Sequence, residues 1–298
     1  MPAVSGPGRW LLRAAATLTT ALTVVITIVA GGGAAVADPP NLMPIPGQVP
    51  NQIERMVPPP DIPHLRSIPA RAQTPGASRE LQELREAIMP SPTGDPFFDV
   101  WPADLARHRP GEVLAQRDVA PVAAPLLEVR VAYARQIKFR TVDAANRPLF
   151  ATATLFVPPA PWQGRGARPV MVNNPPIVAL GTRCTTGYTF AHGKTDDTNS
   201  TDLRPPTTQE ALARGYSVIV PDHTGARMAY AEPYVAAHVV LDSIRAAATV
   251  DKRNFGAGPI AMLGYSGGAI ATNATSTLAS SYALSLIHIS EPTRLGMI

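Results

Sequence analysis

Short apolar runs alternate with segments of helical periodicity through the second half of the chain, and this alternation constrains the fold most. Residues 170–173, 216–220 and 259–263 form compact apolar runs that are typical of buried strands. Residues 208–214 predict a short helix, and residues 234–248 repeat apolar side chains at helical spacing. Strands and helices in this order favour an α/β fold, with a mostly parallel sheet and flanking crossover helices.

Earlier segments predict further elements of this fold. Residues 78–88 predict a helix that Ser78 caps, with three apolar residues on one face. These residues are Leu81, Leu84 and Ile88. Residues 137–142 and 149–157 predict a pair of strands joined by a turn. Residues 95–99 are expected to form a loop.

A G-x-S-x-G sequence joins the last predicted strand to the last predicted helix. Residues 264–268 (GYSGG) directly follow the apolar residues 260–263 and directly precede the small residues 269–272. The pattern alone is weak, because glycine and serine are common residues. Its position between a strand and a helix predicts a nucleophile elbow, in which the outer glycines give room and a sharp turn exposes Ser266. The alternative is an ordinary glycine-rich turn.

Chemistry at Ser266 needs an oxyanion hole and a base. The backbone N–H of Gly267 is the predicted first oxyanion donor, because it follows the nucleophile at the start of a helix. A serine hydroxyl is a poor nucleophile without a base. The only histidine and the only acid after Ser266 are His288 and Glu291, close together and in the reverse of the usual acid-then-histidine order. The catalytic triad is therefore expected to be incomplete in this chain.

The remaining histidines and the single cysteine are interpreted as structural. His223 follows Asp222 at a strand end, where it either belongs to a structured loop or lines a site. His238 and Asp242 lie one helical turn apart and are interpreted as a surface pair. No metal site is predicted. Cys184 is the only cysteine, which excludes a disulfide or a zinc cage built within the chain. It is either a buried free thiol or has a partner outside these residues.

Residues 1–37 have the features of an export signal. Two arginines precede the mostly apolar run 21–30, and residues 35–37 (Ala-Val-Ala) form a small-x-small cleavage pattern before Asp38. An uncleaved membrane anchor is the alternative, but the apolar run is short for a span. Residues 38–75 are rich in proline and predict an extended, poorly packed leader. The mature protein is therefore expected to be secreted.

Composition and charge exclude other classes of protein. Hydrophobic residues make up 45% and charged residues 16%, which suits a globular enzyme rather than a disordered chain. The formal net charge is +4, and the 26 basic residues are scattered rather than gathered in a run that follows a phosphate backbone. No nucleic-acid partner is therefore expected.

Several segments besides the GYSGG turn resemble the secretory lipases of the LIP type, the family of fungal lipase A and its actinobacterial relatives. These segments are residues 95–98 (DPFF), 110–114 (PGEVL), 133–139, 215–225 (GYSVIVPDHTG), 239–246 (VVLDSIRA) and 264–269 (GYSGGA). The likeness runs from about residue 95 to residue 283. Residues 76–283 are therefore expected to form the N-terminal part of an α/β-hydrolase domain.

The resemblance implies an activity and a second site residue. The family hydrolyses acyl esters, including triacylglycerols, and needs no cofactor. Its substrates imply lipid or other ester partners, with transient contact at a lipid interface. The second oxyanion donor of the family lies in the loop after an early core strand, which matches residues 179–184 here. Gly181 is the first choice for this donor.

The C-terminal residues 284–298 have no counterpart in that family. Residues 284–294 (LSLIHISEPTR) instead resemble, residue for residue, the translated transposon-end adapter of short-read sequencing libraries. We therefore expect residues 284–298 to be adapter-derived and the hydrolase domain to be truncated after the nucleophile elbow. Such a fragment is expected to be inactive, because the triad acid and histidine would be missing.

Three functions stay open from the sequence. The first is a secreted serine hydrolase, specifically a triacylglycerol lipase that forms an acyl-enzyme on Ser266. The second is a short-chain esterase or acyltransferase on the same fold. The third is an exported α/β module that binds a ligand or partner without catalysis.

Overall fold

In the computed structural model, internal contacts divide the chain into two units, Met1–Asp61 and Ile62–Ile298. The structure describes residues 62, 64–177, 179–196, 198 and 206–284, all of which belong to the second unit. The predicted export signal, the first part of the predicted leader and residues 285–298 of the predicted adapter-derived tail therefore lie outside the described residues.

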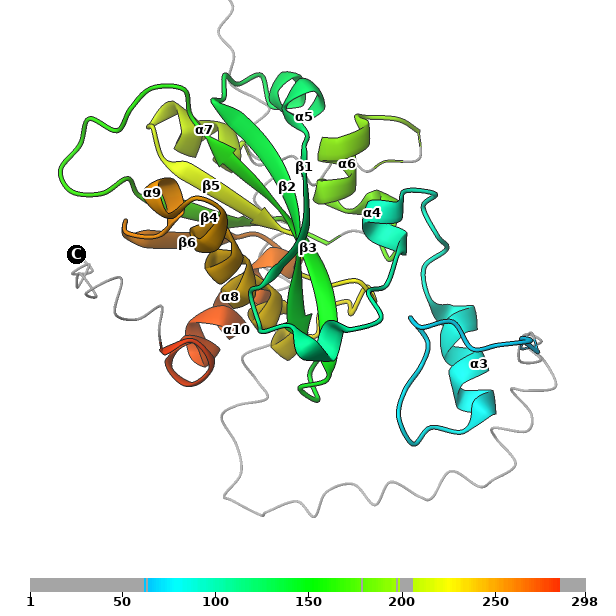
Figure 1. Cartoon of the computed structure of the whole chain (residues 1–298). Coiled ribbons are helices and arrows are strands. Elements are labelled where there is room, and N and C mark those ends of the chain that lie inside the picture. Colours follow the sequence, from blue (N-terminus) through cyan, green and yellow to red (C-terminus); the bar gives the residue numbers. More distant parts are fainter. Residues whose placement is uncertain (1–61, 63, 178, 197, 199–205, 285–298) are drawn as a thin grey trace, which may run out of the picture. The chain divides into compact units, whose positions relative to one another are not determined.

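A six-stranded sheet organises the described residues (Figure 1). Its strands are β1 (Val113–Asp118), β2 (Tyr133–Val142), β3 (Pro148–Val157), β4 (Val170–Asn174), β5 (Ser217–Pro221) and β6 (Ile260–Gly264). Their spatial order is β1-β2-β3-β5-β4-β6. The pairs β1–β2, β2–β3 and β3–β5 are antiparallel, whereas β4 runs parallel to both β5 and β6. The sheet is thus mixed, and the expected parallel part consists of β5, β4 and β6.

The antiparallel pair β2–β3 is the predicted early strand pair. Ten residue pairs join the two strands, from Tyr133 opposite Val157 to Val142 opposite Pro148. Asp143 closes the turn between them, because its Oδ1 accepts the N–H groups of Ala145 at 2.9 Å and Arg147 at 3.0 Å. The predicted pair is therefore confirmed, although β2 begins four residues before the predicted start at residue 137.

Helices pack on both faces of this sheet (Figure 1). The α-helices are α3 (Arg79–Ile88), α4 (Pro96–Asp99), α5 (Ala120–Leu126), α6 (Thr186–His192), α7 (Thr207–Ala213), α8 (Pro233–Val250), α9 (Lys252–Phe255) and α10 (Gly267–Tyr282). Two 3-10 turns are η1 (Leu105–Arg107) and η2 (Thr182–Cys184). The predicted helices agree with α3, α7, α8 and α10. In the described part of the chain, no helix is long and apolar enough to span a bilayer.

Residues 95–99, expected to form a loop, contain the short helix α4. The Asp95 side chain accepts the Phe97 N–H at 2.9 Å, and Pro96 occupies the first helical position. A capping acid followed by proline therefore starts one helical turn where the sequence had indicated irregular chain.

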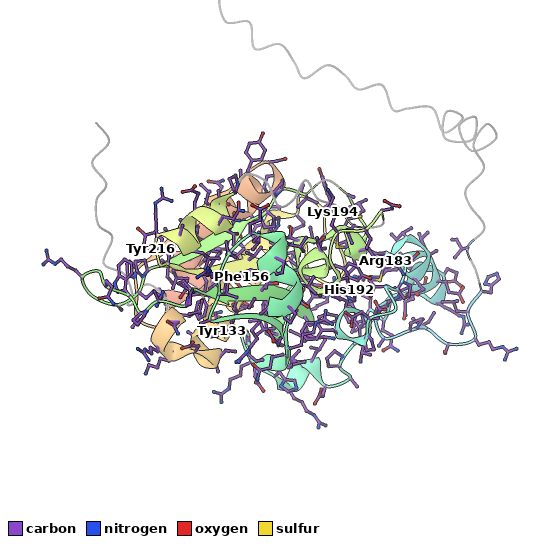
Figure 2. All side chains as sticks on the ribbon, turned by 90° about the horizontal axis from the view of Figure 1, so that it is seen from above. Tyr133, Phe156, Arg183, His192, Lys194 and Tyr216 are labelled. Atoms are coloured by element: carbon purple, nitrogen blue, oxygen red, sulfur yellow. The ribbon has the colours of Figure 1, made fainter. Side chains whose placement is uncertain are left out.

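Two hydrophobic cores lie on opposite faces of the sheet, and β3 contributes to both. Leu155 faces the core that α8 and α10 cover. Its neighbour Phe156 faces the core beneath α5, α6 and α7, where its ring meets the Phe190 ring at 5.1 Å. Figure 2 shows Phe156 in the interior, where it is fully buried. Successive strand residues alternate faces, so a strand covered on both sides reads as a continuous apolar run.

The predicted surface pair on α8 is wrong, because His238 and Asp242 are 4% and 0% exposed. Asp242 accepts hydrogen bonds from Thr141 at 2.8 Å, Tyr282 at 2.9 Å and Arg245 at 2.7 Å. The His238 ring packs against the Tyr282 ring at 4.4 Å. The helix α8 packs against both the sheet and α10, so its polar residues face packed neighbours instead of solvent.

Candidate active site

The predicted elbow has a strand, a sharp turn and a helix in direct succession. Ser266 lies in the turn between β6 and α10, with φ 55° and ψ −121°. A positive φ is uncommon for a residue with a side chain and marks local strain. The Gly268 N–H closes the turn by donating to the Tyr265 carbonyl at 2.9 Å. Ser266 is exposed at the carboxyl end of β6, whereas the two residues that follow it are buried.

Close packing around the turn explains its glycines. A Cβ on Gly264 would lie 2.0 Å from the Gly268 carbonyl oxygen, and a Cβ on Gly268 would lie 2.0 Å from the Asn174 carbonyl oxygen. The Asn174 Nδ2 also donates to Thr272 Oγ1 on α10 at 2.8 Å. The helix α10 therefore starts against the ends of both β6 and β4. This confirms the predicted close approach at the two outer glycines.

The loops after the three parallel strands meet at one edge of the sheet. Residues 175–177 follow β4, residues 222–224 follow β5, and Ser266 follows β6. A Cβ on Gly267 would lie 2.9 Å from Ile177 Cγ1, so the loop after β4 packs directly against the elbow. Carboxyl edges of parallel strands are the usual place for ligand sites in α/β folds. The elbow thus lies where the topology favours a site.

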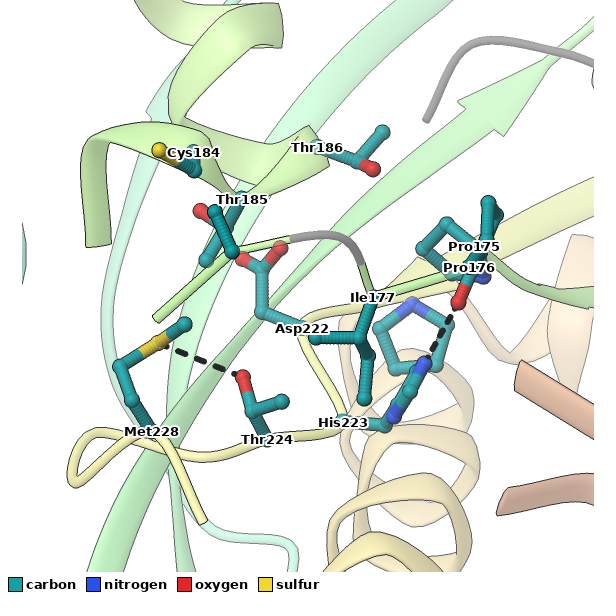
Figure 3. Close-up of a pocket in the computed structure, with 12 residues that line it drawn as sticks. Pro175, Pro176, Ile177, Cys184, Thr185, Thr186, Asp222, His223, Thr224 and Met228 are labelled. Carbon is teal, nitrogen blue, oxygen red and sulfur yellow. Dashed lines mark hydrogen bonds between the residues drawn. The ribbon is translucent and has the colours of Figure 1, made fainter. Parts of the chain in front are cut away.

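A small cavity lies beside the elbow, between the loops after β4 and β5 (Figure 3). Its volume is about 20 Å³, which is far below that of a substrate pocket. His223 lines it and donates from Nε2 to the Pro175 carbonyl at 2.8 Å. Burial lowers the pKa of His223, so the imidazole stays neutral at neutral pH. His223 therefore belongs to a structured loop, as one interpretation predicted, and the alternative that it lines a functional site stays untested.

Asp222 is a buried carboxylate that joins three elements at the same edge. It accepts the Gly187 N–H of α6 at 2.9 Å and the Thr152 hydroxyl of β3 at 2.5 Å. Burial raises the pKa of Asp222 to about 6, against the lowering effect of these hydrogen bonds. A Cβ on Gly187 would lie 2.0 Å from Asp222 Oδ2, so only glycine fits there. The sequence singled out no role for Asp222, although an acid directly after a buried strand was the available signal.

Gly181, the predicted second oxyanion residue, lies between the end of β4 and α6. It caps η2 with φ −92° and ψ 140°, and its carbonyl accepts the Cys184 N–H at 2.9 Å. Gly267 is the first residue of α10, where an N–H has no acceptor within the helix. Cys184 is half-buried and free among the described residues, rather than fully buried.

Comparisons with known proteins agree on one family. Residues 192–290 match the family described as Secretory lipase. A probable inactive lipase of Mycobacterium tuberculosis is 32% identical over 193 residues, which cover 64% of this chain and 43% of that protein. A secreted triacylglycerol lipase of Malassezia restricta is 28% identical over 201 residues, which cover 65% of this chain and 38% of that protein. Over part of its length, this chain is similar to the secretory lipases.

A solved lipase structure shares the fold of this chain. The closed state of Candida antarctica lipase A aligns with a TM-score of 0.55 and 26% identity, over 66% of this chain and 44% of that one. The mixed sheet with helices on both faces is therefore the α/β-hydrolase fold. The chain spans about two fifths of the length of the curated relatives that it matches.

Among the described residues, no base contacts Ser266, the predicted nucleophile. Among those residues, no histidine or carboxylate forms a hydrogen bond with Ser266, and His223 binds a backbone carbonyl instead. His288 and Glu291 lie outside the described residues. Over the same residues, no three His, Cys, Asp or Glu side chains gather as a metal site would require. The roles of Ser266, Gly267 and Gly181 therefore stay predictions.

Proposed function

We propose that the protein is a secreted carboxylic-ester hydrolase that acts on lipid esters, specifically triacylglycerols, through an acyl-enzyme on Ser266. The observation that carries this proposal is the exposed Ser266 at φ 55°, between the end of a parallel strand and the start of α10. A strained serine in this position is the arrangement that presents a hydroxyl to a substrate in α/β hydrolases. The lipase names of the relatives support the substrate class.

The proposed reaction uses the elbow in two ways. The Ser266 hydroxyl attacks the ester carbonyl, its proton passes to a base, and the alcohol leaves to give an acyl-enzyme that water then hydrolyses. The negative oxygen of the tetrahedral intermediate is bound by the Gly267 N–H, which the dipole of α10 supports. A second N–H from Gly181 completes the proposed oxyanion hole. A donor of this kind contributes roughly 10²- to 10³-fold in turnover.

The base is the part of the machinery that the described residues do not supply. Without a base the Ser266 hydroxyl stays protonated at neutral pH. Oxyanion donors alone give a far smaller rate enhancement than a complete triad does. We therefore propose that turnover depends on a base from outside the described residues.

Two reactions test the proposal on the full-length protein. A fluorophosphonate probe should label Ser266, and p-nitrophenyl esters should be hydrolysed. The Ser266→Ala variant should lose labelling and several powers of ten in turnover, whereas Ser281→Ala, an exposed serine near the end of α10, should keep both. A Ser266→Ala variant that keeps a tenth of the activity would place the nucleophile elsewhere.

Two alternatives are separated by the same assays. A non-catalytic role is favoured by the relative named a probable inactive lipase and by the absence of a base on Ser266 among the described residues. It predicts no fluorophosphonate labelling. A short-chain esterase or acyltransferase would label but would prefer p-nitrophenyl butyrate to the palmitate ester, which a triacylglycerol lipase would hydrolyse well.

Export is proposed from the sequence features of residues 1–37 and from the secreted character of the family. Cleavage after Ala37 should release a mature protein that begins at Asp38. N-terminal sequencing of culture medium measures this directly. Recovery of the intact N-terminus from the membrane fraction would instead indicate an anchor.

A further inference from the structure

The apolar face of α3 is left open to solvent. Leu81, Leu84 and Ile88 share this face and are 55%, 37% and 74% exposed. The sequence predicted that these residues share a face, which is normally a face that packs against the core. Contiguous exposed apolar side chains instead mark surfaces that bind something.

This face forms one wall of a groove of about 480 Å³. The opposite wall comes from the loop between β5 and α8, through Arg227 and Met228. Six of the ten described lining residues are apolar, and none of the ten is acidic. The volume falls in the range of small-molecule sites, roughly 300–1,000 Å³. The groove therefore suits an apolar ligand of moderate size.

Two guanidinium groups line the same groove. Arg85, on α3, donates to the hydroxyl of Thr74, which is a neutral acceptor. Arg227 is mostly buried, lies 4.9 Å from the centre of the Trp101 ring, and donates to a backbone carbonyl at 3.3 Å. Both guanidinium groups thus reach the groove without a carboxylate at hydrogen-bond distance.

The acid that faces these two arginines is already engaged. Asp143 Oδ2 binds Arg147 Nε at 2.8 Å and lies 3.7 Å from Arg227 Nη1. Three guanidinium groups therefore face one carboxylate, which leaves an excess of positive charge. Burial and then repulsion from Arg85 lower the pKa of Arg227 to about 10, as expected for a crowded cation. Of the three acids of α3, Glu83 pairs with Arg79, Glu86 pairs with Arg71, and Glu80 does not line the groove.

We propose that this groove binds a long-chain carboxylate, with the carboxylate between Arg85 and Arg227 and the alkyl chain along the open face of α3. The apolar wall selects the alkyl chain, and the uncompensated positive charge selects the anionic head over a neutral lipid. A fatty acid is the acid product of the ester hydrolysis proposed above. The site nonetheless rests on its own residues and is separate from the Ser266 elbow.

Equilibrium dialysis of radiolabelled oleate against the full chain, below the concentration at which oleate forms micelles, tests the charged end of the site. Oleate should bind at least tenfold more tightly than oleyl alcohol, which has the same chain without the charge. Arg85→Gln should weaken oleate about tenfold, as expected for the loss of a charge-assisted hydrogen bond, and leave oleyl alcohol unchanged. Arg85→Lys should stay within about threefold of the parent, and Arg214→Gln, an exposed arginine on α7, should have no effect.

The apolar wall has its own matched pair of variants. Ile88→Ser should weaken both oleate and oleyl alcohol, whereas Val100→Ser, an exposed apolar residue outside the groove, should change neither. Equal affinity for the two ligands, or an Arg85→Gln variant that binds oleate like the parent, would overturn the proposal. Ser266→Ala should still bind oleate, because the groove does not include Ser266. The binding test therefore remains valid even if the protein does not hydrolyse esters. Loss of oleate binding in Ser266→Ala would show that the ligand occupies the elbow instead.

Discussion

Asp222 forms a buried hydrogen-bonded cluster with Thr152 and Gly187. Replacing Asp222 by asparagine removes the ionisable group of this cluster and keeps the shape of the side chain. In the parent protein Oδ1 accepts the Gly187 N–H at 2.9 Å and Oδ2 accepts the Thr152 hydroxyl at 2.5 Å. The asparagine Oδ1 can keep the first bond, and its Nδ2 can donate to the Thr152 oxygen after the hydroxyl rotates. The substitution therefore changes charge far more than packing.

The size of the effect follows from the pKa of Asp222. Burial raises this pKa from 3.8 to about 6 in the folded state. A shift of this size, at 1.36 kcal/mol per pKa unit, corresponds to about 3 kcal/mol. As pH rises above 4 the unfolded chain loses the Asp222 proton first, while the folded protein holds it until about pH 6. The folded state binds more protons in this window, so the free energy of unfolding falls as pH rises.

Urea unfolding at pH 4 and at pH 7, followed by tryptophan fluorescence, measures this contribution. The free energy of unfolding of the parent should fall relative to that of Asp222→Asn by about 2 to 3 kcal/mol between the two pH values. Glu128→Gln, at an exposed acid whose side chain forms no ion pair among the described residues, should show no such pH-dependent difference. If the free energies of unfolding of the parent and Asp222→Asn differed by the same amount at pH 4 and pH 7, the reasoning would be refuted. Such a result would mean that Asp222 is ionised at both pH values or at neither.

Three further substitutions and one control test the turn and the packing behind it. Ser266→Gly should raise the free energy of unfolding by about 1 kcal/mol in urea titrations while abolishing fluorophosphonate labelling, because glycine relieves the positive φ; a destabilised variant would contradict the strain. Gly268→Ala should lower the free energy of unfolding by roughly 1 to 3 kcal/mol, because the new Cβ would clash with the Asn174 carbonyl. Gly181→Ala, whose Cβ would meet nothing closer than 3.5 Å, should be neutral. Equal effects of the two substitutions would count against the packing argument. Tyr282→Phe should cost about 1 to 3 kcal/mol by removing a hydrogen bond to the buried Asp242, and a neutral result would mean that water replaces it.

Periodicity in the sequence located most elements but not the direction of strand pairing. The apolar runs that became β4, β5 and β6 predicted strands within about a residue of their observed bounds. The early strands β2 and β3 looked no different as patterns, yet they pair antiparallel because only a turn from Asp143 to Arg147 joins them. Short turns require antiparallel neighbours, and helical crossovers permit parallel ones. The connection therefore decided the direction, not the strand sequence.

Helical periodicity likewise predicts a face without predicting what covers it. In α8 the polar His238 and Asp242 suggested a solvent face, but α10 packs over them and Tyr282 reaches both. In α3 the three apolar residues share a face, as predicted, and that face lines an open groove. What covers a helical face depends on elements distant in sequence, which periodicity does not show.

The site divides in the same way between local and distant information. The GYSGG turn is local, because its strand, glycines and helix are contiguous, and the sequence located it fully. The role of Asp222 is not local, since its partners Thr152 and Gly187 lie 70 and 35 residues away. Only the fold shows that an acid after β5 holds the start of α6. A sequence pattern can indicate such a residue by its place after a buried strand but cannot name its partners.

The register between β4 and β6 sets how the nucleophile turn packs against the loop after β4. Asn174, the last residue of β4, pairs with Gly264, the last residue of β6, so both loops leave the sheet at the same level. The Gly268 Cα then packs on the Asn174 carbonyl, and Ile177 packs on Gly267. A register slip of one residue would turn every side chain of β6 to the opposite face and separate these contacts. The packing of the proposed nucleophile turn against the loop after β4 therefore depends on strand pairing, and a variant that loosens the end of β4 should disturb this packing.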